Sequence, residues 1–150
     1  MSTDIKAAAL NYLSRREYTR YELQLKITQK GFDPVKVSDV LDELEGLDFL
    51  SDQRFVENYI VARMRRGFGP VHIQNELARF RAAPEAIEHG FNNCDIDWFE
   101  VLTQLWAKKY KVAPQDSAVY AKQSRFLLQR GFSHQDVHTL LQQKREIGSA

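Results

Sequence analysis

The sequence contains a single cysteine, Cys94, which excludes an intramolecular disulfide and any zinc site built from several cysteines. No apolar run is longer than the four residues from Ala7 to Leu10, so neither a transmembrane helix nor a signal-peptide core is expected. Phosphate-binding Gly-x-x-x-x-Gly-Lys loops, paired-histidine zinc motifs and the Gly-x-Ser-x-Gly nucleophile motif are also absent. We therefore predict a cytoplasmic protein that is not an enzyme, does not contact membranes and uses no cofactor.

Histidines offer the only pattern that resembles a metal site. His134 and His138 have the i, i+4 spacing of a helical metal-binding pair, but no obvious third ligand accompanies them. We expect both side chains to face solvent and predict no metal.

The composition indicates a folded protein whose charge is unevenly distributed. Hydrophobic residues make up 43% of the 150 positions, and 21 Lys and Arg against 20 Asp and Glu give a net charge of +1. Residues 33–52 carry seven acids and one base, and residues 82–100 carry five acids and no Lys or Arg. Residues 63–81 carry five arginines and one acid, and residues 101–130 carry six bases and one acid. Such blocks can steer a charged partner despite the nearly neutral total.

The spacing of apolar residues predicts helices throughout the chain. No stretch keeps the period of two that strands require, whereas apolar residues recur at steps of three and four, as at Val37, Leu41 and Leu44. About nine helices with short connections are expected from this pattern.

Local signals predict where these helices begin and end. Capping residues mark three starts: Thr19, Asp97 and Ser133. Prolines are predicted in four first turns: Pro34, Pro70, Pro84 and Pro114. Glycines are predicted at three helix ends: Gly31, Gly67 and Gly131.

The predicted helices fall into three similar groups. A shift of 100 residues aligns Lys30-Gly31-Phe32 with Arg130-Gly131-Phe132, and a shift of 50 aligns Pro34 with Pro84 but places Arg81 opposite Gly31. The period predicts an all-α fold of three tandem three-helix, helix-turn-helix-like repeats in an elongated, curved body. The expected repeats span residues 1–50, 51–96 and 97–150, the second with an arginine cluster and the third basic. We expect a monomer.

The arginine cluster follows an apolar helical stripe. The stripe consists of Val56, Ile60 and Met64. Arg63 falls within it, so we predict a structural role in which its stem packs and its head reaches an acid or the carbonyls at the helix end. Arg65 and Arg66 fall outside it and are candidates to bind an anion such as phosphate. Cations at a helix end also offset the helix dipole without any partner, and this alternative stays open.

The helix after Pro70 presents polar residues opposite its apolar face. These residues are His72, Asn75 and Arg79, and the equivalent helix of the third repeat presents Lys122 and Arg125. Helix-turn-helix proteins meet DNA with such a second helix. The first repeat lacks these donors and its third helix is acidic. We therefore predict that nucleic acid meets the second and third repeats and that a protein surface meets the first.

A dense group of motif residues spans the second repeat. It comprises Leu50-Ser51-Asp52, Phe55, Tyr59-Ile60, Arg63, Gly67-Phe68-Gly69-Pro70, Ile73 and Glu76-Leu77. In this combination the sequence closely resembles the RecX regulatory proteins of bacteria, with Arg63, Gly67, Gly69 and Pro70 as structural motif positions. The runs from Tyr12 to Leu23 and from Leu127 to Ser133 are similar to the first and third repeats of that family. The chain departs from it at Phe80-Arg81, where the family usually has a Lys-Gly pair.

The resemblance implies three tandem three-helix repeats, no catalysis, and binding to the filament of the RecA recombinase on single-stranded DNA. It further implies inhibition of RecA's ATP hydrolysis, strand exchange and co-protease activity, and so a role in recombination, DNA repair and the SOS response. From the residue patterns, the candidate contacts with DNA or the filament are Arg65, Arg66, His72, Asn75, Arg79, Lys122 and Arg125. We expect binding to single-stranded and double-stranded DNA without sequence preference.

Two other functions remain open at this point. A sequence-specific helix-turn-helix regulator would need one recognition helix in the major groove and usually a two-fold dimer. A helical-repeat adaptor that binds only proteins would show no affinity for nucleic acid.

Overall fold

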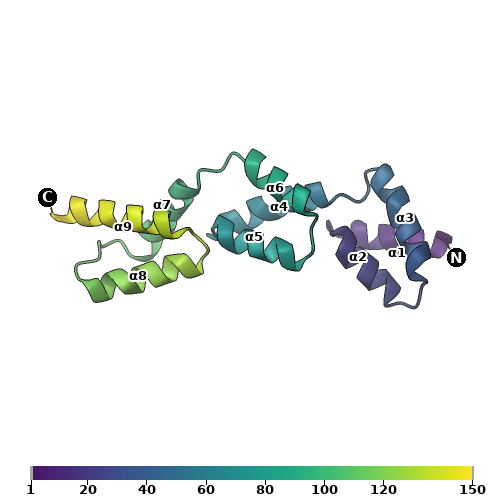
Figure 1. Ribbon diagram of the computed structural model, residues 1–150, viewed down its shortest axis with the longest axis horizontal. Helices are drawn as coiled ribbons and strands as arrows, with labels where there is room; N and C mark the ends of the chain where they lie inside the picture. The colour runs from purple at the N-terminus through teal and green to yellow at the C-terminus, as the bar shows by residue number, and fades with distance from the viewer. Residues whose placement is uncertain (1, 150) are drawn as a thin grey trace. The chain divides into compact units, whose positions relative to one another are not determined.

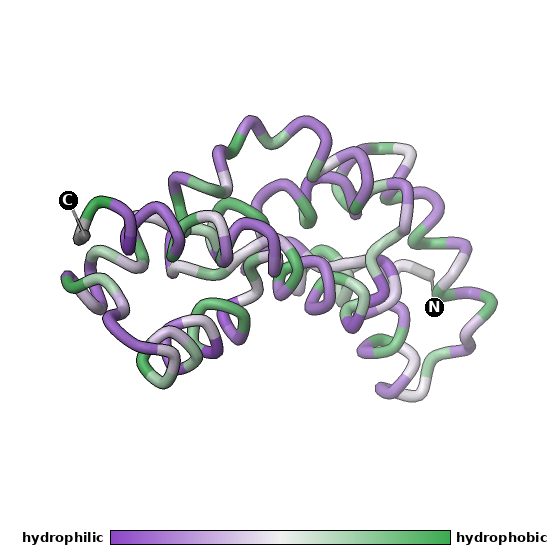
Figure 2. Tube along the Cα trace, turned by 60° about the vertical axis from the view of Figure 1, so that its left-hand side comes forward, coloured by the Kyte–Doolittle hydropathy of each residue, from purple (hydrophilic) through white to green (hydrophobic). Residues whose placement is uncertain are grey.

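The computed structural model describes residues 2–149, which form nine α-helices and no β-strand. The helices are α1 Ser2–Leu13, α2 Arg20–Thr28, α3 Pro34–Gly46, α4 Asp52–Arg65, α5 Pro70–Arg79, α6 Pro84–Asn93, α7 Trp98–Lys109, α8 Ser117–Gln129 and α9 His134–Ser149 (Figure 1). Hydrophobic and hydrophilic residues are interspersed along the whole trace, and no long stretch is uniformly hydrophobic (Figure 2). The predicted all-helical fold is confirmed.

The chain divides into two compact units, each of which is built from two separate stretches of the sequence. Unit 1 contains Met1–Asn58 and Glu76–Asn93, and unit 2 contains Tyr59–Asn75 and Cys94–Ala150. Helices α4 and α5 therefore each contribute residues to both units.

In unit 1, α1, α2 and α3 share one hydrophobic core. Leu23 and Ile27 of α2 and Leu41 of α3 are completely buried in it. In unit 2, α7, α8 and α9 share a second core, in which Leu127 and Leu141 are completely buried. The pairs Ile27 with Leu127 and Leu41 with Leu141 are those that the shift of 100 residues aligns, so the repeat in the sequence is also a repeat in the core.

One core position differs between these two groups. Leu23 corresponds to Gln123, which is buried on α8 with 4% of its surface exposed. Its amide oxygen accepts a hydrogen bond from Trp106 Nε1 at 2.9 Å, and its Nε2 donates to the carbonyl oxygen of Val112 at 3.2 Å. The buried amide is therefore satisfied, as burial of a polar group requires.

Most of the predicted helix ends are confirmed. Thr19 forms a complete capping box with Glu22, and Asp97 caps α7 by accepting a hydrogen bond from the backbone of Glu100. The three predicted glycines all have positive φ: Gly31 at 101°, Gly67 at 83° and Gly131 at 98°.

The prediction for Pro114 is wrong. Pro34, Pro70 and Pro84 begin α3, α5 and α6, but Pro114 lies buried in the loop before α8. Helix α8 begins three residues later, because the side chain of Asp116 accepts a hydrogen bond from Val119 N and provides the cap.

Arg81 occupies the position at which the other two repeats have glycine. It ends α5 with a φ of 55°, in the left-handed region that disfavours residues with a Cβ atom. Its guanidinium lies 5.1 Å from the ring centroid of Tyr21. Arg81 therefore has the left-handed backbone conformation of the corresponding glycines although it carries a side chain.

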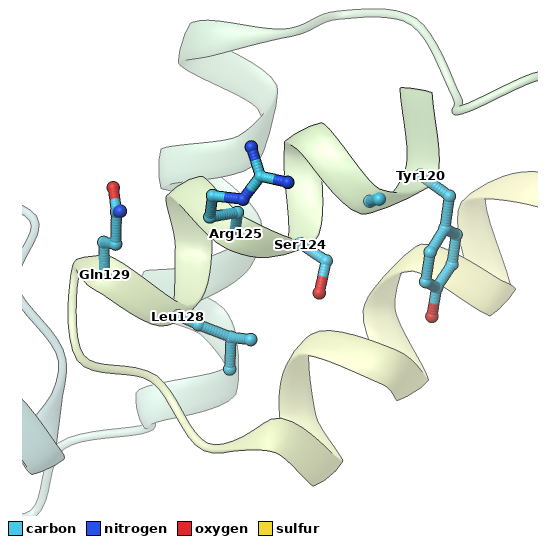
Figure 3. A pocket seen from close by; sticks show the side chains of 6 residues that line it. Tyr120, Ser124, Arg125, Leu128 and Gln129 are labelled. Carbon is cyan, nitrogen blue, oxygen red and sulfur yellow. The ribbon is translucent and has the colours of Figure 1, made fainter. Parts of the chain in front are cut away.

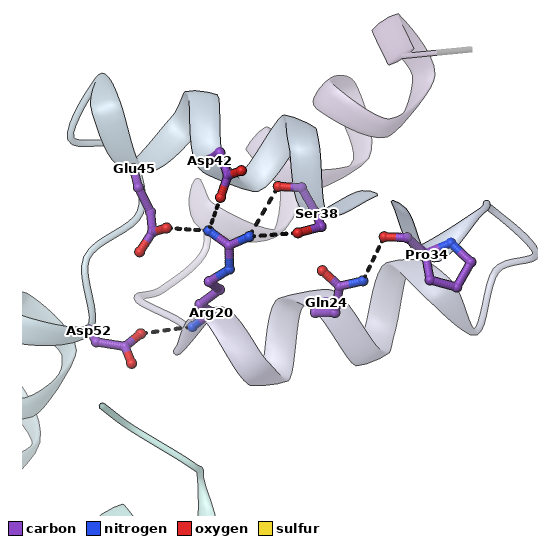
Figure 4. A network of polar contacts seen from close by, with 7 residues as sticks. All are labelled: Arg20, Gln24, Pro34, Ser38, Asp42, Glu45 and Asp52. Atoms are coloured by element: carbon purple, nitrogen blue, oxygen red, sulfur yellow. Dashed lines mark hydrogen bonds and ion pairs between the residues drawn. The ribbon is translucent and has the colours of Figure 1, made fainter. Parts of the chain in front are cut away.

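Helices α2 and α3 are joined by a polar network around Arg20 (Figure 4). The guanidinium contacts Asp42 and Glu45 and donates to both oxygens of Ser38, while the backbone N–H donates to Asp52 at 2.8 Å. Burial lowers the pKa of Arg20, but the two carboxylates outweigh this effect and raise it above its usual value.

The turn before α2 and the turn before α5 make contacts at corresponding positions, 50 residues apart, one through a side-chain hydroxyl and the other through a backbone N–H. In unit 1, Thr19 Oγ1 donates to the carbonyl oxygen of Phe80 at 2.8 Å. In unit 2, Gly69 N donates to the carbonyl oxygen of Arg130 at 2.7 Å. A shift of 50 converts the first pair of positions into the second, so the period predicted from the sequence recurs in these joints.

Candidate functional site

The end of α4 is organised around the ring of Phe68. The guanidinium of Arg63 lies 4.1 Å from the ring centroid and that of Arg130 lies 4.3 Å from it. The ring of His72 is stacked on Phe68 at 4.6 Å between centroids. Arg63 is therefore held within the structure by an aromatic contact, and the faces of Phe68 are already occupied.

The loops at either side of this ring approach each other through their backbones. Besides the bond from Gly69 to Arg130, Val71 N donates to the carbonyl oxygen of Gly131 at 2.9 Å. A Cβ atom at Gly131 would lie 2.2 Å from His72 Cβ, so only glycine allows this approach. The contact fixes the start of α5 against the end of α8.

Five cations gather beside this contact and line a cavity of about 600 Å³. They are Arg65, Arg66, Lys108, Lys109 and Arg130. We call the cavity that they line the basic groove. Arg130 is anchored by a hydrogen bond from its Nη2 to the carbonyl oxygen of Arg66 at 3.0 Å, and its Nε is buried without a hydrogen-bond partner. No acidic residue is among the groove's lining residues.

Acidic side chains of the described part of the chain do not pair with the cations of the basic groove. Among the described residues, none of these five side chains forms an ion pair. Cations of unit 1 differ, since Lys6 pairs with Glu43 at 2.7 Å and Arg54 pairs with Glu17 at 2.6 Å. The groove is thus one part of unit 2 whose unpaired positive charges favour an external anion.

Helix α8 carries a second exposed polar face. Lys122 and Arg125 are both exposed. Arg125 also lines a shallow pocket with neighbouring residues of α8, and Figure 3 shows it on the same side of the helix as Gln129. Tyr120 turns toward α9, where its hydroxyl is hydrogen-bonded to His138 Nδ1 at 2.8 Å. Neither Lys122 nor Arg125 lines the basic groove.

The structure brings only two of the candidate residues on α4 and α5 together. Arg65 and Arg66 are exposed and line the groove. Asn75 and Arg79 are exposed on α5 but are not part of the groove lining, and His72 is half-buried against Phe68. His72 is therefore less accessible than the other candidates.

Three groove cations were not singled out by the sequence analysis. The sequence offered one indication of them, because the basic block of residues 101–130 contains Lys108, Lys109 and Arg130. Their selection depends on the fold, because 65 positions separate Arg65 from Arg130 in the sequence.

Within residues 2–149 no group of three or more His, Cys, Asp or Glu side chains could hold a metal ion, and no helix there has the length and apolarity to cross a membrane. His134 and His138 are both exposed.

The fold and the groove define an all-helical repeat protein with a basic cavity. Residues 6–44 match the family model of the first three-helix domain of RecX, and residues 95–141 match that of the third. Regulatory protein RecX of Mannheimia succiniciproducens is 37% identical over 91% of both chains. That of Legionella pneumophila strain Corby is 41% identical over 83% of this chain and 84% of its own. The chain belongs to the RecX family, which confirms the resemblance seen in its motifs.

Two solved structures show the same fold. RecX from Lactobacillus salivarius superposes with a TM-score of 0.78 and 24% identity over 96% of both chains. A second structure of regulatory protein RecX gives a TM-score of 0.76 and 20% identity over 95% of this chain and 73% of the other. They show a shared fold. The curated relatives are named as regulatory proteins and not as enzymes.

Proposed function

We propose that this protein binds the RecA filament on single-stranded DNA and inhibits RecA's ATP hydrolysis, strand exchange and co-protease activity. The observation that carries the proposal is membership of the RecX family over most of the chain. The protein acts in the cytoplasm as a monomer, without catalysis or a cofactor, and so modulates recombination, DNA repair and the SOS response.

The distribution of charge supports a division of the binding surface. Exposed cations on α8, Lys122 and Arg125, are placed to contact phosphates, with Asn75 and Arg79 of α5 as further contacts. Arg65 and Arg66 contact the filament through the basic groove. The repeats 1–50, 51–96 and 97–150 are the units of this division, and the first meets protein because its acids disfavour DNA.

The proposal is tested by measuring ATP hydrolysis by RecA on single-stranded DNA while the protein is added. We expect the rate to fall as the protein is titrated in. Lys122→Ala with Arg125→Ala should require several-fold more protein for the same inhibition. Lys26→Ala with Lys36→Ala is the matched control for DNA binding: it removes two exposed lysines of the repeat that is proposed to meet protein, so its affinity for single-stranded DNA should match that of the parent. An unchanged hydrolysis rate at saturating protein would contradict the proposal.

A gel-shift experiment separates this function from the sequence-specific regulator. Binding through a few phosphate contacts should be weak, salt-sensitive and similar for all DNA sequences. Strong discrimination between selected and random duplexes would favour the regulator. No affinity for any nucleic acid at low salt would favour the protein-only adaptor.

A further inference from the structure

We infer that the basic groove binds an acidic peptide segment that carries a large apolar side chain. This inference concerns a protein ligand of the groove and does not depend on inhibition of RecA. Three features of the groove support it: the unpaired charges of the rim, the apolar floor, and the lack of an open aromatic face for a nucleotide base.

The rim of the groove selects an anion. Its five cations come from three places in the chain: the end of α4, the last turn of α7, and Arg130 after α8. None of them forms an ion pair within the described part of the chain. Several carboxylates spaced along a peptide could therefore pair with them without displacing an existing partner.

The floor of the groove is apolar and only partly covered. It is formed by Met64, Val101 and Leu105, all of which are half-buried. A phosphate backbone has no group that would bury these side chains. An apolar side chain of a peptide would remove them from water, and this gain is proportional to the apolar area that is covered.

The aromatic rings beside the groove do not offer a platform for bases. Lys109 Nζ lies 4.4 Å from the ring centroid of Phe126, and the ring of Phe68 is contacted by Arg63 and Arg130. Proteins that hold single strands without sequence preference stack bases on open aromatic faces. Because cations already cover these rings, the groove fits an acidic and apolar peptide better than a single strand.

The test uses the purified full chain and a short synthetic peptide of aspartates and glutamates with one phenylalanine, labelled for fluorescence anisotropy. A second peptide has glycine in place of the phenylalanine, and an oligothymidylate of equal charge is the nucleic-acid probe. We expect the phenylalanine peptide to bind at least about tenfold more tightly than the glycine peptide, because it buries a large side chain.

Two charge-reversal variants place this binding in the groove. Arg66→Glu with Lys108→Glu changes two exposed groove residues and should weaken binding of the phenylalanine peptide at least about tenfold, since it replaces attraction by repulsion at two sites. Lys26→Glu with Lys36→Glu makes the same change of charge on unit 1 and should leave the affinity within about twofold. Circular dichroism checks that all variants remain helical.

Four results would overturn the inference. Equal affinity for the two peptides would show that the floor is not used, and absence of peptide binding would remove the site. Tighter binding of the oligothymidylate, lost in the groove variant, would make the groove a nucleic-acid site. A dimer at low salt that the groove variant abolishes would identify a second copy as the occupant. RecA inhibition is measured separately, so either proposal can fail alone.

Discussion

At the scale of single residues, three neighbouring arginines have different surroundings. Arg63 is half-buried and lies over Phe68, whereas Arg65 and Arg66 are exposed on the rim of the groove. The helical angles place Arg63 in the apolar stripe and the other two outside it, which is consistent with these positions.

Replacing Arg63 should therefore lower stability, whereas replacing Arg65 and Arg66 should weaken inhibition of RecA. Arg65→Ala with Arg66→Ala should change stability by only about 0.5 kcal/mol, as exposed substitutions do, while weakening inhibition of RecA. Arg63→Ala should cost about 1 kcal/mol, through lost stem packing and the lost contact with Phe68. Urea denaturation and RecA ATP hydrolysis measure the two effects. If the double variant inhibits RecA as well as the parent does, these two cations only offset the dipole at the end of α4.

Arg81 provides a second test at this scale. A residue with a Cβ atom costs about 1–2 kcal/mol in the left-handed region, and the exposed contact with Tyr21 returns about 0.5 kcal/mol of this. Arg81→Gly should therefore stabilise the protein by about 1 kcal/mol. Thermal or urea denaturation of the full chain measures the change. A loss of stability would show that the Tyr21 contact outweighs the backbone strain.

At the scale of the elements, the joint between the turn before α5 and the turn after α8 depends on glycine. Gly31 and Gly131 have similar φ values and follow a basic residue, but a Cβ atom at Gly31 would meet nothing within 4 Å. The two positions thus share the conformational demand, and only Gly131 also lies against another helix.

Replacing each glycine by alanine separates these two effects. Gly31→Ala should lose about 1–2 kcal/mol from the left-handed conformation alone. Gly131→Ala should lose at least about 1 kcal/mol more, because its Cβ would overlap His72 and force the joint apart. Urea denaturation of both variants gives the difference. Equal losses would mean that the two turns can separate freely.

The sequence predicted the elements better than the contacts between them. Apolar spacing, capping residues and glycines are local signals, and they correctly placed the helices and the ends at Gly31, Gly67 and Gly131. The prediction for Pro114 was wrong because proline is compatible with loops as well as with first turns. Helix α8 instead begins after its N-cap, Asp116.

The groove required information that local patterns do not contain. Arg65 and Arg66 could be selected because they leave an apolar stripe, but their association with Lys108, Lys109 and Arg130 depends on tertiary packing. The joint between the turns at Gly69 and Gly131 consists of backbone hydrogen bonds, so side-chain patterns carry little trace of it. The contact of Thr19 with Phe80 uses a side-chain hydroxyl, but its acceptor is a backbone carbonyl 61 positions away in the sequence.

At the scale of the whole molecule, the net charge of +1 conceals two kinds of cation. Those of unit 1 include residues held in ion pairs, such as Arg20 and Arg54, whose pKa values are raised by their acidic partners against the opposing effect of burial. Those of the basic groove have no such partners in the described chain. The basic groove therefore supplies the unpaired positive charge that the proposed binding requires.

Electron cryo-microscopy of RecA filaments on single-stranded DNA with this protein bound tests the central claim most directly. The proposed function predicts additional helical density on the filament, along its groove or at its ends, and this density should diminish with Arg65→Ala and Arg66→Ala. Filaments that remain bare at saturating concentrations of the protein would contradict it.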